Sequence, residues 1–182
     1  MPLVYCPMTI FGKIILGALL ISPVLGHGQN EEFIEWSAAK RLSWEDYLAK
    51  PSSSSDAAAI TSTALGLEYH VRNNILTYKI TCRFSKTRSW GKYRTDYILQ
   101  HEQGHFDITE LYARKLDDAI REYSFNPKKF KTDLDQIYKE IMEEKEEVQN
   151  QYDLDTDFSR NPEKQSEWLK KIQRELTRYS AT

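Results

Sequence analysis

The pentad His101-Glu102-Gln103-Gly104-His105 restricts the fold of this chain more than any other feature. It lies within TDYILQHEQGHFDITELYARKLDDAIREY, where apolar residues recur at helical spacing. Histidines four residues apart on an α-helix lie one above the other, so both imidazoles can reach one metal ion. At about 100° per residue, Glu102 projects beside them. The pentad therefore predicts a helix that carries a metal site.

The two histidines and the glutamate lie on the same side of this helix as its apolar residues. Gln103 and Asp107 fall on the opposite side, which we expect to face solvent. Polar side chains that point inward need partners, and a zinc ion with its bound water suits two histidines and a carboxylate. The alternative is an ordinary packing helix whose two core histidines are satisfied by hydrogen bonds.

A catalytic zinc site has three protein ligands and leaves one position for water. His101 and His105 are two predicted ligands, and Glu102 is the predicted general base. Glu110 lies near 180° on the helical wheel, so an unbroken helix cannot bring it to the metal. The third ligand must come from elsewhere in the fold, and Asp153 is our candidate.

Other residues could also supply that third ligand. Asp155 and Asp157 share the segment YDLDTDFSR with Asp153, and His70 lies in a predicted hairpin. Each aspartate is also typical of a turn or a helix cap, and His70 of an ordinary strand residue. The D-x-D-x-D spacing is not a calcium loop, because Phe158 and Lys164 stand where glycine and a bidentate glutamate are needed.

The first 28 residues predict a secretory signal peptide. Lys13 precedes the apolar run IILGALLISPVLG, and Gly26 and Gly28 follow it. The run is short and interrupted for a membrane span, although an uncleaved anchor is the alternative. We therefore expect a secreted or periplasmic protein with no stable membrane span after cleavage.

The remaining residues, 29–182, predict a single domain. This part of the chain keeps only one cysteine, Cys82, which excludes an internal disulfide and a thiolate-rich zinc site. The whole chain has 25 basic and 27 acidic residues, and no basic run is interleaved with aromatics. Nucleic-acid binding therefore has no electrostatic support.

The pattern of strands and helices predicts an α+β fold, a small antiparallel sheet followed by three helices. Ser43 is placed to cap a short turn, and AITSTALGLEYHV and ILTYKITCRF alternate as two strands around a turn at residues 72–74. Residues 85–94 and 152–160 are expected to be loops. The helices are expected at about 96–123 with Thr95 as N-cap, from Pro127 after Asn126, and from Pro162 after Asn161.

The chain resembles a bacterial family of unknown function whose members are commonly described as predicted secreted zinc-dependent proteases. The segments that carry the resemblance are RLSWEDY, AAITSTALGLEY, Ser89-Trp90, HEQGHFDITELYAR, YDLDT and the spacing of Gln165 and Trp168. The resemblance implies an exported α+β protein with a peptidase-like metal helix. The family pattern often has a histidine where this chain has Phe158. If that histidine is the third ligand in the relatives, the resemblance implies that this chain either uses Asp153 or Asp157 instead or holds metal poorly.

These observations favour a secreted zinc metallopeptidase that acts on peptides or proteins. Two alternatives stay open. One is an exported scaffold or binding module without catalysis, and the other is a metal-dependent hydrolase of a cell-wall amide or another non-protein substrate.

Overall fold

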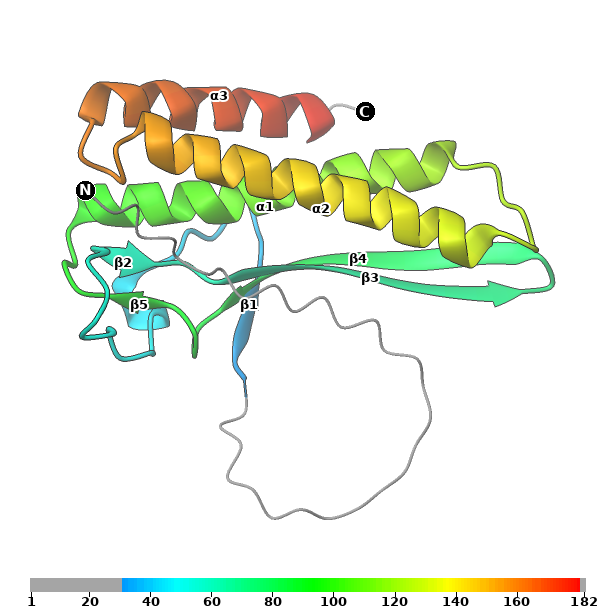
Figure 1. Cartoon of the computed structure of the whole chain (residues 1–182), viewed down its shortest axis with the longest axis horizontal. Helices are drawn as coiled ribbons and strands as arrows, with labels where there is room; N and C mark the ends of the chain where they lie inside the picture. Colours follow the sequence, from blue (N-terminus) through cyan, green and yellow to red (C-terminus); the bar gives the residue numbers. More distant parts are fainter. Residues whose placement is uncertain (1–30, 181–182) are drawn as a thin grey trace, which may run out of the picture.

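The computed structural model describes residues 31–180 (Figure 1). The predicted signal peptide, residues 1–28, lies outside the described residues. Within them, a small antiparallel sheet is followed by three helices, which confirms the α+β prediction. No helix in residues 31–180 has the length and apolarity needed to cross a bilayer.

The strands form two antiparallel sheets. The larger has the order β1-β4-β3, and the smaller pairs β2 with β5. The strands are β1 (Phe33–Glu35), β2 (Ala59–Ile60), β3 (Thr63–Arg72), β4 (Ile75–Ser85) and β5 (Trp90–Gly91), with a short 3-10 turn η1 (Trp44–Asp46).

The long hairpin of β3 and β4 follows the predicted turn. Arg72 pairs with Ile75, and the two residues between them, Asn73 and Asn74, have φ values of 52° and 61°. Asparagine tolerates this left-handed region better than most residues, so the Asn-Asn pair fits a tight two-residue turn. The turn prediction is confirmed.

Residues 85–94 are not all loop, as the sequence had predicted. Trp90 and Gly91 form β5 and pair with Ile60 and Ala59. A two-residue strand is too short to produce an alternating pattern, so periodicity could not reveal it.

The helices are α1 (Asp96–Glu122), α2 (Phe130–Asp155) and α3 (Pro162–Ser180). Helix α1 begins as predicted, because the Thr95 side chain accepts a hydrogen bond from the Ile98 amide. It contacts the hairpin on one side and both other helices on the other (Figure 1). The buried core lies along it and includes Leu65, Phe84, Phe106, Leu116, Tyr152 and Ile172.

Helix α2 differs from the prediction at both ends. It begins at Phe130, because Pro127 to Lys129 form a turn in which the Asn126 carbonyl accepts the amides of Lys129 and Phe130. It continues to Asp155, into the segment predicted as a loop. There the buried Tyr152 packs against α1, and the Thr156 hydroxyl bonds the Tyr152 carbonyl at 2.7 Å.

Candidate metal centre

Three potential metal ligands meet where α1 and the last turn of α2 lie side by side. Nε2 of His101 and Nε2 of His105 each lie 3.1 Å from the same Oδ1 of Asp153. The two Nε2 atoms are 3.2 Å apart. The three residues form a group whose donor atoms all lie within 4.8 Å of one another. Two imidazoles and a carboxylate are a donor set that suits zinc or another divalent transition metal.

The centre is mostly buried. The His101 side chain is 5% exposed, whereas Asp153 is 31% and His105 15% exposed. Asp153, on α2, is therefore the most exposed of the three residues.

Gln149, one turn before Asp153 on α2, orients His105. Its Oε1 accepts from Nδ1 of His105, while its Nε2 donates to the His105 carbonyl at 2.9 Å and to Thr109 Oγ1 at 3.2 Å. Because the amide nitrogen is occupied by these acceptors, its oxygen faces the ring, and Nδ1 must carry the proton. The Nε2 lone pair of His105 is then free for a metal.

Tyr152 orients His101 in a different way. Its ring stacks on the His101 imidazole with centroids 4.6 Å apart and 16° between the planes. Its hydroxyl donates to the His101 carbonyl at 3.2 Å. The close approach needs Gly104, since a Cβ there would lie 2.5 Å from the tyrosine oxygen and 2.8 Å from Cζ. The glycine of the pentad therefore makes room for the ring that supports its first histidine.

The charged side chains of the centre shift one another's pKa values. Burial would raise the pKa of Asp153, but hydrogen bonds and the charges of His101 and His105 outweigh it and hold the pKa well below its usual range. Burial would lower the pKa of His105, but Asp153, Glu102 and Gln149 outweigh it and raise the pKa to about 9. Without a metal, His105 and Asp153 therefore form an ion pair at neutral pH.

Glu102 lies next to the centre and is only 4% exposed. Burial raises its pKa, and the charges of both histidines and a hydrogen bond from Thr61 partly offset that rise. The Thr61 hydroxyl in turn lies 2.7 Å from the Tyr47 hydroxyl. The carboxyl group is thus held between the two histidines and a short chain of hydroxyls.

Residues 25–160 match the model of a family described as bacterial protein of unknown function, DUF922. The chain belongs to this family. No curated protein and no solved structure matches the chain. The DUF922 match spans His101, Glu102, His105 and Asp153, and it ends just before α3.

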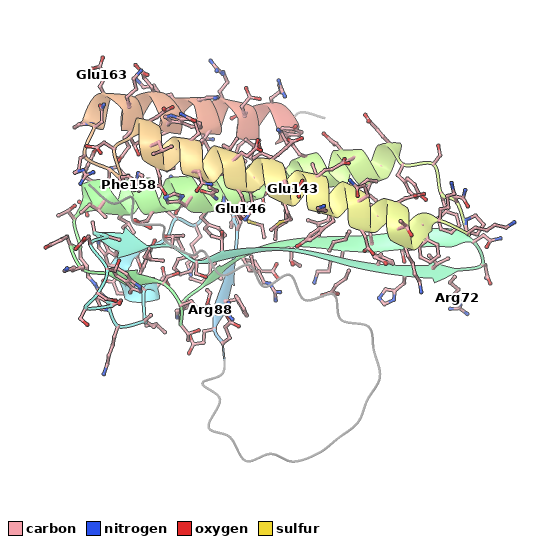
Figure 2. All side chains as sticks on the ribbon, viewed as in Figure 1. Arg72, Arg88, Glu143, Glu146, Phe158 and Glu163 are labelled. Atoms are coloured by element: carbon pink, nitrogen blue, oxygen red, sulfur yellow. The ribbon has the colours of Figure 1, made fainter. Side chains whose placement is uncertain are left out.

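The other third-ligand candidates in this DUF922 chain have structural partners. Asp155 accepts a hydrogen bond from Trp168 Nε1 at 2.9 Å, and Asp157 pairs with Arg160 at 2.7 Å. His70 lies on β3, two residues before Arg72. Figure 2 shows Arg72 at one end of the molecule and Phe158, which follows α2, at the other. The structure brings Asp153 to the two histidines and leaves these three residues away from them.

Phe158 lies in an unusual turn after α2. Asp157, Phe158 and Ser159 all have positive φ, at 48°, 54° and 68°. The Phe158 amide donates to the Asp153 carbonyl at 2.8 Å, so this turn fixes the end of α2 on which Asp153 lies. The Phe158 side chain is 54% exposed.

Gln103 and Asp107 are buried, which corrects the prediction that they face solvent. Asp107 accepts hydrogen bonds from Trp36 Nε1 and Arg41 at 2.9 Å each and from Gln103 Nε2 at 2.7 Å. Gln103 Oε1 accepts from the Leu42 amide at 2.8 Å. The segment before β2 thus covers the second face of α1, which a helical wheel of α1 alone cannot show.

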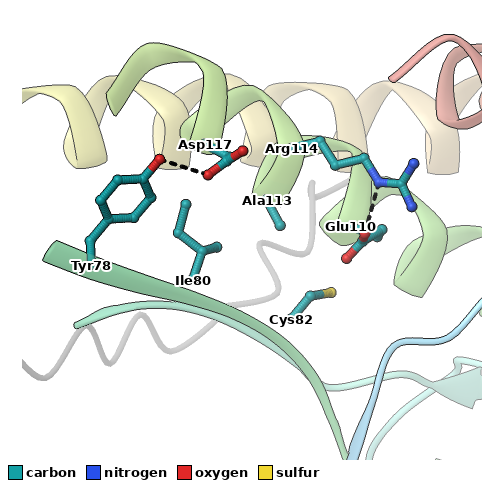
Figure 3. Close-up of a pocket in the computed structure, with 7 residues that line it drawn as sticks. All are labelled: Tyr78, Ile80, Cys82, Glu110, Ala113, Arg114 and Asp117. Atoms are coloured by element: carbon teal, nitrogen blue, oxygen red, sulfur yellow. Dashed lines mark hydrogen bonds and ion pairs between the residues drawn. The ribbon is translucent and has the colours of Figure 1, made fainter. Parts of the chain in front are cut away.

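A polar hollow of about 290 Å³ lies between β4 and α1 (Figure 3). Its polar groups are paired with each other, Tyr78 with Asp117 at 2.9 Å and Glu110 with Arg114 at 2.8 Å. Burial raises the pKa of the Cys82 thiol at its floor. None of the residues that line it belongs to the metal centre.

Proposed function

We propose that this protein is an exported, zinc-dependent metallopeptidase that hydrolyses peptide bonds. The observation that carries the proposal is the convergence of His101, His105 and Asp153 beside a buried glutamate, Glu102. The family that the chain belongs to is described only as bacterial and of unknown function. The apolar run at residues 14–26 supports export.

The three ligands would hold a zinc ion, which supplies a Lewis acid and lowers the pKa of a coordinated water to about 7. The donor set fits this role, because the Nε2 atoms of His101 and His105 converge on one carboxylate oxygen of Asp153. Gln149 and Tyr152 hold the two rings in place.

Glu102 would act as the general base. With a metal bound, its carboxylate would accept the proton of the attacking water and would then return that proton to the leaving amine. Burial raises its pKa, which brings the group closer to the pH at which a carboxyl group can both accept and return a proton. Thr61 restrains its carboxyl group through a hydrogen bond.

The proposal is tested with the purified protein, Glu102→Gln and the matched control Glu122→Gln, an exposed glutamate on the same helix. We expect stoichiometric zinc in all three proteins by mass spectrometry of the metal. Hydrolysis of a fluorogenic peptide library should fall about 10²–10⁴-fold in Glu102→Gln alone, the size of a general-base contribution. Activity that survives this change, or a wild type without stoichiometric metal, would overturn the proposal.

A further inference from the structure

Two segments form the end of the molecule opposite the metal centre. One is the turn of the β3–β4 hairpin, residues 69–76, and the other runs from the end of α1 into the first turn of α2, residues 123–132 (Figure 1). The rings of Tyr69 and Phe130 connect the two segments, with centroids 6.1 Å apart and 85° between the planes. We refer to these two segments as the distal end.

The distal end is cationic, although the whole chain has a net charge of -2. Its two segments contain no aspartate or glutamate, and their lysines and arginines are all exposed, namely Arg72, Lys128, Lys129 and Lys131. Within residues 31–180, none of these four side chains forms an ion pair. The nearby Arg121, by contrast, is paired with Asp117 and Asp118. The four charges are therefore available to an anionic partner.

The hairpin turn also exposes two aliphatic side chains. Ile75 is 65% exposed and Val71 is 38% exposed. Ile75 pairs with Arg72 and Val71 pairs with Leu76, so the two apolar side chains lie on opposite faces of the hairpin. A partner that covered one face would reach only one of them. A partner that receives the turn end-on would reach both.

A bilayer with anionic headgroups is a partner of this kind. Apolar side chains enter the boundary between headgroups and acyl chains, while lysines and arginines around them meet the negative surface. Exposed apolar side chains bordered by charged residues are typical of interaction sites rather than of ordinary solvated surface. The charge and the apolar tip of the distal end thus fit one and the same surface.

The opposite end of the molecule also exposes apolar side chains, but among acids. Leu154 is 64% exposed and lies between Asp153 and Asp155 in the chain. Phe158 is 54% exposed and follows Asp157. An anionic surface repels these carboxylates. Charge complementarity therefore selects the distal end alone.

Nucleic acid is a poorer match for the distal end. Proteins that bind single strands usually present aromatic faces on which the bases stack. Phe130, within the lysine run, instead packs against Tyr69 and against Phe125, whose ring centroid lies 5.6 Å away. All three of these rings are half-buried. The lysines therefore have no exposed tyrosine, phenylalanine or tryptophan ring beside them for a base.

We propose that the distal end docks this protein on an anionic phospholipid bilayer, with Val71 and Ile75 in the interface and the four cations against the headgroups. This docking goes beyond the proposed peptidase activity and does not depend on it. Along α1, His105 lies roughly 25 Å from Glu122, where the distal end begins. A docked molecule would therefore keep its metal centre away from the lipid.

The test measures binding of the purified protein to vesicles of phosphatidylglycerol, with vesicles of phosphatidylcholine as the neutral comparison. We expect phosphatidylglycerol to be preferred and the preference to weaken as salt is added. Lys128→Gln with Lys129→Gln should lower the partition coefficient about 25-fold, since each cation near an anionic surface contributes about fivefold. The matched control, Lys50→Gln with Lys170→Gln, removes two exposed lysines elsewhere and should change it less than about twofold.

The apolar tip is tested by Ile75→Ser, which should lower the partition coefficient about three- to tenfold. Leu154→Ser is its matched control, because Leu154 has nearly the same exposure at the opposite end of the molecule. We expect no change in binding from that control. All of the replaced side chains are exposed, and thermal melts check that each variant is folded.

Amide hydrogen exchange locates the contact. Phosphatidylglycerol vesicles should slow exchange at residues 71–76 and 124–129, and binding through any other part of the chain would not reproduce that pattern. Vesicle binding without this protection, or unchanged binding of the Lys128→Gln, Lys129→Gln protein, would overturn the docking proposal and leave the peptidase proposal untouched. Binding of DNA with the same variant losses, and no binding of vesicles, would also overturn it and would assign the cations to nucleic acid.

Discussion

Gly104→Ala is the most informative single change in the metal helix, because two effects of opposite sign compete there. Helix propensity alone favours alanine by about 1 kcal/mol. Packing opposes it, since the new Cβ would lie 2.5 Å from the hydroxyl oxygen of the fully buried Tyr152. Overpacking costs about 1–3 kcal/mol, and loss of the bond from Tyr152 to the His101 carbonyl adds about 0.5–1.5 kcal/mol.

The packing effects should win by about 0.5–3.5 kcal/mol in the free energy of unfolding. For a domain of this size, that corresponds to a fall in Tm of about 1–14 °C by calorimetry. Zinc affinity should fall too, because Asp153 follows Tyr152 directly on α2.

A double-mutant cycle with Tyr152→Phe provides the control. Removing the hydroxyl removes the atom closest to the new Cβ, so Gly104→Ala should cost less in the Tyr152→Phe background than in the wild type. A Gly104→Ala protein with a higher Tm than the wild type would refute the reasoning. It would mean that the Tyr152 ring can move away from the new Cβ without loss of stability.

Three further predictions concern the network around α1 and the centre. Asp107→Ala should lower the free energy of unfolding in urea by about 2–4 kcal/mol, because the buried Gln103 Nε2 and the half-buried Trp36 Nε1 lose their acceptor. Asp118→Ala, on the same helix, should change it by less than about 0.5 kcal/mol. The metal-free protein should gain stability from the His105–Asp153 pair between about pH 4 and pH 6.5. Thermal melts should show this gain lost as the pH rises from 6.5 towards the His105 pKa of about 9, because the imidazolium then loses its proton. They should also show it lost below pH 3.8, because the Asp153 carboxylate is then protonated. Zinc at a thousand times its Kd should stabilise the wild type by about 4 kcal/mol, and an equal zinc shift in Asp153→Asn would argue against that ligand.

The sequence predicted helix α1 well because its signals are local. Thr95 caps the helix where the chain turns, and the apolar periodicity places His101, Glu102 and His105 on one face without help from the rest of the fold. The hairpin turn at Asn73-Asn74 was predictable for the same reason.

The partners of that helix could not be predicted from its own pattern. The burial of Gln103 and Asp107 depends on a segment 61 to 71 residues earlier in the chain. Asp153 was placed in a loop, because its aspartate-rich surroundings are typical of turns. One signal was present, since Gln149, Tyr152 and Asp153 have the i, i+3, i+4 spacing of one helix face.

The hydrogen bonds from Trp36 and Leu42 to α1 have a consequence for the order of folding. A helix of 27 residues forms from local contacts, but these bonds close loops of 71 and 61 residues, which is slow. We therefore expect helix α1 to form first, with the Gln103 and Asp107 face exposed to water. Residues 36–42 should pack on that face in a later step. A nascent chain that ends before Asp107 should leave Trp36 without its acceptor, so its indole fluorescence should report the moment of closure.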